Sequence, residues 1–224
     1  MAHVTANGFV VLSGKLTFPR QGAWVGDLVV DTDAGIAGAC EVAIQGGLTL
    51  EGTAVRGGVF LGTTTIRVAP GADGLRKTAR AQHYRQTKVG TVLGDLLRTA
   101  GEKLSPTADP AMLATTLPAW TVRADPVGKM IAAVFADARA GKASWRFLPD
   151  GTLWVGPETW ADGGLVAPDG YIEIGEDPEL AAMDVGVDAL VPMPGTTLDG
   201  RRVSYVEVSI EGGAVRARVL FEPS

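Results

Sequence analysis

The chain has 224 residues with 20 Lys or Arg, 25 Asp or Glu, a net charge of −5 and a 46% apolar share, which exclude an intrinsically disordered chain. The mild acidity argues against nucleic-acid binding over the whole surface. No apolar run approaches the ~20 residues of a membrane helix, so we expect no membrane anchor. The first residues lack a basic segment followed by a long apolar stretch, so we expect no secretory signal.

The first third of the sequence alternates short apolar runs with turn residues. Five runs with alternating apolar or β-branched residues predict strands at 9–18, 24–30, 39–45, 48–56 and 59–69. The pairs Gly46-Gly47 and Gly57-Gly58 separate three of these runs and predict tight hairpin turns. Strands joined by such short loops are antiparallel, and a sheet of this size tends to close into a barrel or a sandwich.

The pattern becomes helical in the middle of the chain. Thr87 is expected to cap a helix that ends at Gly101. Asp125, followed by Pro126, is expected to cap a second helix that ends at Gly141. Apolar residues at helical spacing mark the buried faces of the two helices: Val89, Val92, Leu93, Leu96 and Leu97 in the first, and Val127, Met130, Ile131, Val134 and Phe135 in the second.

Shorter elements surround these helices. A short helix is expected near 110–115. A hairpin is predicted from 144–148 and 152–156 across the Pro-Asp-Gly turn at 149–151. The turn-rich segment 157–170 is expected to be a linker, after which strands resume at 171–174.

The last residues predict a long two-stranded ribbon. Two alternating runs, 203–210 and 215–221, flank the turn at 211–213. In the first run, Val203 is expected on the face opposite Val206 and Val208. A long ribbon with two faces at a chain terminus more often docks onto neighbours than holds a substrate, so we interpret it as a candidate barrel-closing or assembly element.

Residues that could carry catalysis or bind a metal are few. His3 and His83 lack a second histidine or cysteine at ligand spacing, so we expect no metal and no cofactor. The single Cys40 lies in an alternating run and is interpreted as a buried structural thiol. The acidic pair Asp31 and Asp33 lies beside turn residues, where carboxylates are usually solvated. No nucleotide-binding loop or hydrolase motif is present, so we expect a protein without enzymatic activity.

The basic stretch between Asp73 and Asp95 permits two interpretations, and so do the tryptophans, of which the chain has five. The stretch has no acidic residue between Asp73 and Asp95, and it either faces phosphates or an acidic partner, or forms a solvated linker or an inter-subunit salt-bridge strip. Its candidate patch residues are Arg76, Lys77, Arg80, Arg85 and Lys88. Trp145 and Trp154 flank the predicted hairpin and either stack on sugars or, as we favour, close a small core over the helix pair.

Taken together, the β, then α/β, then β order of these elements resembles the tail hub, or baseplate hub, proteins of tailed phages, typified by the contractile phages T4 and Mu. The resemblance rests on that order, on the two helices with the hairpin at 145–154, and on the closing segment 194–219. It implies two β-barrel domains per subunit and a trimer that presents a pseudo-sixfold ring. Such a ring joins the sixfold tail tube to the threefold spike around a DNA channel.

The resemblance also implies a domain plan and partners. The expected fold class is α+β, mainly β, with barrel strands at 1–80, an inserted α+β domain at 85–160 and C-terminal barrel strands at 165–224. The expected partners are further copies of the chain, the tube protein, the spike protein and other baseplate proteins, with DNA only as passing cargo. The expected location is the virion tail or baseplate, after assembly in the host cytoplasm. Contacts between subunits are expected at Trp24, Tyr205, Val206, Val208, Arg216 and Arg218.

Two alternatives remain open from the sequence. One is a hexameric tube or distal-tail protein with a single barrel. The other is a carbohydrate-binding or wall-degrading tail component that uses Trp145, Trp154 and the carboxylates at 173–177, namely Glu173, Glu176 and Asp177.

Overall fold

A closed antiparallel barrel of six strands forms the N-terminal part of the computed structural model, which describes residues 4–44, 47–137, 143–162, 173–174, 182–185, 193–198 and 200–222. The strands follow the order β1-β4-β5-β6-β3-β2, and β1 pairs again with β2 to close the ring. Their bounds are β1 Val4–Ala6, β2 Phe9–Pro19, β3 Val25–Val30, β4 Gly38–Ile44, β5 Leu48–Phe60 and β6 Thr63–Pro70. The mainly β, α+β fold class is therefore confirmed.

The short strand β1 closes the barrel through one asparagine. Asn7 and Gly8, at φ 48° and 83°, turn the chain from β1 into β2, as an Asn-Gly pair does in tight hairpins. The Asn7 side chain then extends the ladder of β1: its Nδ2 donates to the Ala39 carbonyl at 3.2 Å, and its Oδ1 accepts from the Glu41 N–H at 2.8 Å. Two backbone groups of β4 that lie beyond the end of β1 thereby obtain hydrogen-bond partners without a further strand.

The predicted turn at Gly57-Gly58 is wrong. Both glycines lie inside β5, and the hairpin turn falls at Leu61-Gly62, with φ 47° and 80°. A Cβ on Gly57 would lie 2.8 Å from the Thr65 carbonyl of β6, so the absence of a side chain serves close strand approach here. The other predicted pair, Gly46-Gly47, falls partly on residues outside the described ranges.

A second sheet grows from the barrel strand β2. The ribbon β15 Arg201–Glu211 and β16 Ala214–Phe221 pairs with β2 through β15, in a register from Tyr205 opposite Pro19 to Glu211 opposite Ser13. Beyond β16 the sheet continues with β13 Ala182–Val185 and β12 Glu173–Ile174, while β14 Thr196–Leu198 joins β15 to the parallel β11 Ala161–Asp162. The ribbon does not close this six-stranded barrel, because β1 already pairs with β2. That the ribbon belongs to a second barrel stays a prediction.

The burial pattern of the ribbon departs from strict alternation at one point. The register shifts between Val203 and Tyr205, so Ser204 is an extra residue on β15. Such a bulge reverses the faces of the residues before it. Val203 is therefore buried together with Val206, Val208 and Ile210, whereas the sequence pattern placed it on the opposite face.

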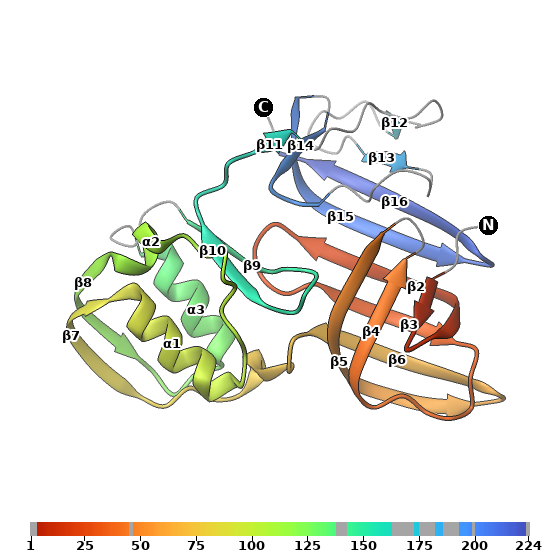
Figure 1. The fold of residues 1–224 in the computed structure, drawn as a ribbon, viewed down its shortest axis with the longest axis horizontal. Coiled ribbons are helices and arrows are strands. Elements are labelled where there is room, and N and C mark those ends of the chain that lie inside the picture. The colour runs from red at the N-terminus through yellow and green to blue at the C-terminus, as the bar shows by residue number, and fades with distance from the viewer. Residues whose placement is uncertain are drawn as a thin grey trace.

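A unit of helices and small sheets follows the barrel (Figure 1, left). The helices α1 Val89–Ala100 and α3 Val127–Ala136 pack against each other, and all the residues predicted from the helical spacing are buried, with Ala100 in addition. The remaining elements are η1 Gly74–Arg76, β7 Gln82–Lys88, α2 Pro110–Ala114, β8 Thr116–Val122, β9 Ser144–Phe147 and β10 Leu153–Gly156. The short helix, the β9–β10 hairpin and the helix end at Gly101 are confirmed.

Both predicted caps of the long helices are wrong by one residue. Thr87 belongs to β7, which pairs with β8, and α1 begins after Lys88 with no side-chain cap. Asp125 does not cap α3; its carboxylate pairs with Lys129 at 3.1 Å, and Pro126 occupies the cap position. α3 ends at Ala136, and the predicted end at Gly141 lies outside the described residues. Among the described helices none is long and apolar enough to cross a bilayer.

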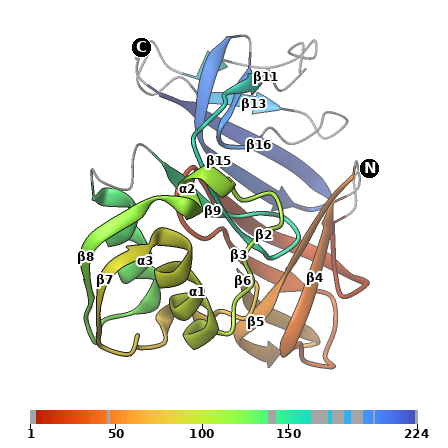
Figure 2. The same cartoon turned by 60° about the vertical axis from the view of Figure 1, so that its left-hand side comes forward.

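A buried carboxylate fastens the turn that follows β6 and the start of η1 to the end of α1. Glu102, directly after α1, accepts hydrogen bonds from the N–H groups of Ala72 at 3.0 Å and Gly74 at 2.7 Å. The turn of the β9–β10 hairpin also reaches β5, where the Glu51 N–H donates to the Pro149 carbonyl at 2.7 Å. Figure 2 shows the hairpin lying between the helices and the barrel strands.

Candidate assembly surfaces

The interface residues predicted from the sequence divide between the core and the surface. Trp24 lies inside the barrel with 2% of its surface exposed, and its ring lies 6.4 Å from that of Phe18. Val206 and Val208 are fully buried beneath the ribbon. A subunit contact through these three side chains would require them to lie at the surface. They are instead enclosed by their own chain.

The other predicted interface residues lie on the outer face of the ribbon. Tyr205 is half-buried, and Arg216 and Arg218 are exposed. The two arginines border a shallow hollow of about 290 Å³ together with Glu207 and Ser209. Because Lys15 of the neighbouring β2 pairs with Glu207 at 2.5 Å, the polar face continues from the ribbon onto the barrel. Whether this face contacts another subunit stays a prediction.

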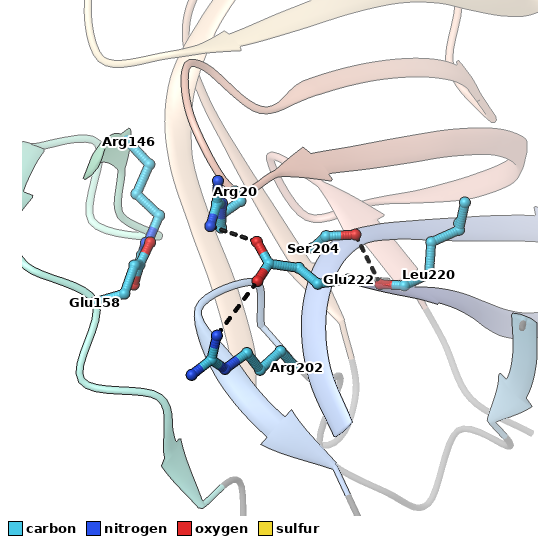
Figure 3. Close-up of polar contacts among 7 residues, drawn as sticks. All are labelled: Arg20, Arg146, Glu158, Arg202, Ser204, Leu220 and Glu222. Carbon is cyan, nitrogen blue, oxygen red and sulfur yellow. Dashed lines mark hydrogen bonds and ion pairs between the residues drawn. The ribbon is translucent and has the colours of Figure 1, made fainter. Parts of the chain in front are cut away.

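The end of the ribbon is fastened by a cluster of ion pairs (Figure 3). Glu222 pairs with Arg20, which follows β2, and lies 3.9 Å from Arg202 of β15. The guanidinium groups of both arginines also contact the Trp160 ring, at 5.7 and 4.9 Å from its centre. Nearby, Arg146 of β9 pairs with Glu158 at 2.6 Å, and both side chains are largely shielded from solvent. The cluster joins three segments that are far apart in the sequence.

The basic stretch is not the linker that one interpretation assumed. It forms η1 and β7, and two of its cations have partners inside the chain: Arg76 pairs with Asp73, and Lys77 donates to the Ala100 carbonyl at 2.7 Å. The three others, Arg80, Arg85 and Lys88, are exposed. A phosphate or an acidic partner for these three stays a prediction.

The two tryptophans of the carbohydrate-binding alternative are engaged within the chain. Trp145 is buried with 7% exposed. The Trp154 indole N–H donates to the Thr107 carbonyl at 3.2 Å, and the Arg146 guanidinium covers its ring at 4.5 Å from the centre. Glu173 lies in β12, whereas Glu176 and Asp177 fall outside the described residues.

Of the two histidines, His3 also falls outside the described residues. His83 is exposed, and its Nδ1 lies 2.9 Å from the Thr121 hydroxyl.

Asp31 and Asp33 are exposed in the loop between β3 and β4, as expected for solvated turn residues. Within the part of the chain that the structure describes, no three histidine, cysteine or acidic side chains gather as metal ligands would.

A cleft of about 520 Å³ separates β4 and β5 from the segment after α1 and the turn of the β9–β10 hairpin. Glu41, Glu51 and Asp150 line it, and Cys40 lies in its wall with 3% exposed. Burial, and then the charge of Glu41, raise the pKa of the Cys40 thiol to about 11. The raised pKa and the burial both lower the reactivity of the thiol, in agreement with a structural role.

Alkylation of Cys40 by iodoacetamide at pH 8 should be slow in the folded protein. A pKa raised from 9.0 to about 11 lowers the thiolate fraction roughly a hundredfold, and burial slows the reaction further. Because the unfolded thiol ionises first, the stabilising contribution of this group is complete below pH 9 and is lost as the pH rises through about 11. Mass spectrometry of labelled protein with and without guanidinium chloride measures the difference. Equal labelling rates would contradict this placement of Cys40.

Sequence reasoning missed the exposed apolar residues at the barrel mouth. At the end of β5 and in the turn that follows it, Val59, Phe60 and Leu61 are 52%, 72% and 86% exposed; we call them the hairpin knob. At the start of β2, the exposed fractions of the β2 face, defined as Phe9, Val10 and Leu12, are 41%, 44% and 39%. The signal that could have revealed the knob is three consecutive apolar residues next to a Leu-Gly turn, which breaks the alternation of a half-buried strand.

The fold is shared with solved structures of tail proteins. No protein-family model matches the chain, and no curated protein matches its sequence. The 43 kDa tail protein of prophage MuSo2 from Shewanella oneidensis superposes with a TM-score of 0.70 at 11% identity, over 98% of this chain and 96% of that one. A tail protein from Neisseria meningitidis gives 0.66 at 13% identity, over 100% and 97%.

A third similar structure comes from a secretion machine. It is an Escherichia coli component of the type VI secretion system, described as structurally similar to the T4 bacteriophage tail proteins gp27 and gp5. The TM-score is 0.69 at 10% identity, over 99% of this chain and 76% of that one. The chain thus has, along nearly its whole length, the fold found in these phage tail and secretion proteins.

Proposed function

We propose that the protein is a structural component of a phage tail or tail-like particle, a trimeric hub that joins the sixfold tail tube to the threefold spike around a DNA channel. The observation that supports this proposal is the agreement in fold, over 96% or more of both chains, with two tail proteins. The similar secretion component, described through its likeness to T4 tail proteins, favours the hub among tail components. The proposal includes tube, spike and other baseplate proteins as partners and assigns no enzymatic activity.

The architecture suits a symmetry adaptor. Each chain carries the closed barrel and, attached to it through β2, the C-terminal sheet. Three copies around one axis would therefore present six β units to a sixfold tube, while the chain itself keeps threefold symmetry. We propose the division into barrel strands at 1–80 and 165–224 and a peripheral insertion at 85–160 on this basis. The location in the virion tail, the assembly in the host cytoplasm and the passage of DNA belong to the same proposal.

The stoichiometry of the purified protein tests the hub. We expect light scattering coupled to size exclusion, and native mass spectrometry, to give three copies per particle, and negative-stain images to show a ring with a central opening. Six copies with plain sixfold symmetry would contradict the hub and would favour the tube or distal-tail alternative. A protein that stays monomeric at high micromolar concentration would contradict both.

A further inference from the structure

The small sheet of β7 and β8 carries a row of exposed cations. His83 of β7 lies opposite Thr121 of β8, and Arg85 follows His83 two residues later. Residues two apart on a strand share a face and lie ~6.6 Å from each other. Arg123 therefore extends the row beyond Thr121, and Lys88 ends it at the other end of β7. We define the basic face as the four exposed residues His83, Arg85, Lys88 and Arg123.

The charges of the basic face are not compensated within the part of the chain that the structure describes. There, no carboxylate lies within ion-pair distance of any of its four residues. By contrast, two exposed cations on the helices are paired: Arg98 with Asp95 at 2.7 Å and Lys129 with Asp125 at 3.1 Å. Like charges in a row repel one another, so an anionic partner would stabilise the basic face.

Protein carboxylates match this surface better than nucleic acid does. Single strands bind where bases stack on aromatic side chains, but the two aromatic residues of the sheet, Tyr84 and Trp120, lie opposite each other and pack against the core. A duplex needs no stacking, but the net charge of −5 on the whole chain repels a long polyanion. A short acidic segment of a protein brings only a few charges to the row.

The chain itself contains such an acidic segment. Residues 169–188 include seven Asp or Glu and no Lys, Arg or His, and no cation occurs anywhere between Arg146 and Arg201. The strands β12 and β13 lie within this range, at the end of the C-terminal sheet that is farthest from the barrel. We call residues 169–188 the acidic segment; its carboxylates are Asp169, Glu173, Glu176, Asp177, Glu179, Asp184 and Asp188.

The basic face and the acidic segment belong to different parts of one copy. β7 and β8 form a sheet of their own, whereas β13 pairs with β16. Figures 1 and 2 both show β13 well apart from β7 and β8. We propose that the basic face of one copy binds the acidic segment of a second copy. This inference rests on the proposed assembly of copies and adds one electrostatic contact to it, whatever the number of copies.

An exchange of charges tests the contact. The basic-face variant carries Arg85→Glu and Lys88→Glu, and the acidic-segment variant carries Glu176→Lys and Asp177→Lys. Each variant places like charges opposite each other, so we expect the dissociation constant between copies, measured by sedimentation velocity, to rise roughly tenfold or more. A chain with all four changes should return to within roughly twofold of wild type, because opposite charges face each other again.

The matched controls make the same kinds of charge change elsewhere on the exposed surface. Arg56→Glu on β5, and Asp31→Lys with Asp33→Lys in the loop before β4, should leave the dissociation constant unchanged. Thermal unfolding of every variant verifies that the fold is retained. Recovery in the chain with all four changes also separates the contact from any loss of folding in the single-sided variants.

A synthetic peptide of residues 169–188 reads the contact without the oligomer. Its fluorescence anisotropy should show saturable binding to the full-length wild-type chain and roughly tenfold or more weaker binding to the basic-face variant. Binding should also weaken as sodium chloride is raised, because salt screens exposed charges. A short DNA duplex of random sequence serves as the comparison at the same salt concentration. Tighter binding of the duplex than of the peptide to the basic face would overturn the acidic segment as its partner.

The outcomes keep the contact and the hub distinct. Peptide binding to the basic face in a chain that does not form trimers supports the contact and overturns the hub. A trimer whose dissociation constant is the same in the basic-face variant, the acidic-segment variant and the wild type overturns the contact and leaves the hub intact. Weakened assembly that the four combined changes do not restore also overturns the contact.

Discussion

Trp24→Ala should lower the free energy of unfolding by about 3–5 kcal/mol, because it leaves a large cavity in the barrel interior. Trp24 is 2% exposed, packs near Phe18, and its ring lies 3.0 Å from the position of a Cβ on Gly52. Urea denaturation followed by circular dichroism measures the change. The sequence suggested a subunit contact for Trp24, and this experiment distinguishes the two roles: a core residue destabilises the dissociated chain as well as the oligomer.

Trp24→Phe is the matched control. The buried Trp24 Nε1 has no hydrogen-bond partner among the described residues, so phenylalanine removes an unsatisfied donor while it keeps most of the ring volume. We expect a loss of about 1–2 kcal/mol, well below that of the alanine variant. Equal unfolding midpoints for wild type and Trp24→Ala, with only the oligomeric state altered, would show that Trp24 is an interface residue.

Gly74→Ala should destabilise the protein by about 1–3 kcal/mol or more, because the added methyl group has no space. A Cβ at this position would lie 1.9 Å from the Ala100 carbonyl oxygen at the end of α1, and backbone atoms cannot yield as a flexible side chain does. The Gly74 N–H also donates to Glu102, so any shift weakens the hydrogen bond that holds η1 against the end of α1. Thermal unfolding measures the loss.

Gly94→Ala is the opposite case in the same helical unit. Gly94 lies inside α1, and a Cβ there would meet nothing within 4 Å. Alanine restricts the unfolded chain and favours the helix, so we expect a gain of about 0.5–1 kcal/mol. If both glycine variants changed stability in the same direction, close packing between η1 and the end of α1 would not explain the effect of Gly74.

Elements whose residue pattern lies within a few neighbouring residues were predictable from the sequence. The apolar spacing of α1 and α3, the Gly101 helix end and the Pro-Asp-Gly turn of the β9–β10 hairpin are all found where the pattern placed them. Each depends on residues within one or two turns of each other. Helix starts were less accurate, because Thr87 is held in β7 by its pairing with Leu117 thirty residues later.

Elements that form only through contacts with residues far away in the sequence were missed. β7 is polar and exposed except for Tyr84, so it lacks the alternation that marks a half-buried strand. It becomes a strand because β8 pairs with it and because Tyr84 packs on α1, where its hydroxyl donates to Asp95 at 2.9 Å. Burial and then this hydrogen bond raise the pKa of Tyr84 to about 12.

The candidate assembly surfaces also combine features set by neighbouring residues with features set by residues far apart in the sequence. The alternation of the ribbon predicted two faces but not which of them is buried. The bulge at Ser204, which turns Val203 inward, depends on the pairing with β16. The hairpin knob had a local signal in its three consecutive apolar residues, whereas the β2 face could not be recognised as exposed before the ring of strands was known, because an apolar residue on a strand is normally expected in the core.

The amino-acid pattern alone therefore determined both long helices, the short helix, the β9–β10 hairpin, the terminal ribbon and most strands of the barrel, since these depend on neighbouring residues. Only the tertiary structure decided that β1 closes the barrel, that the terminal ribbon extends β2 instead, and that Trp24 is enclosed while Phe60 and Leu61 are not. The physical reason is that a strand can pair with many partners in many registers at similar hydrogen-bond energy. The choice among them comes from the burial of side chains that are far apart in the sequence.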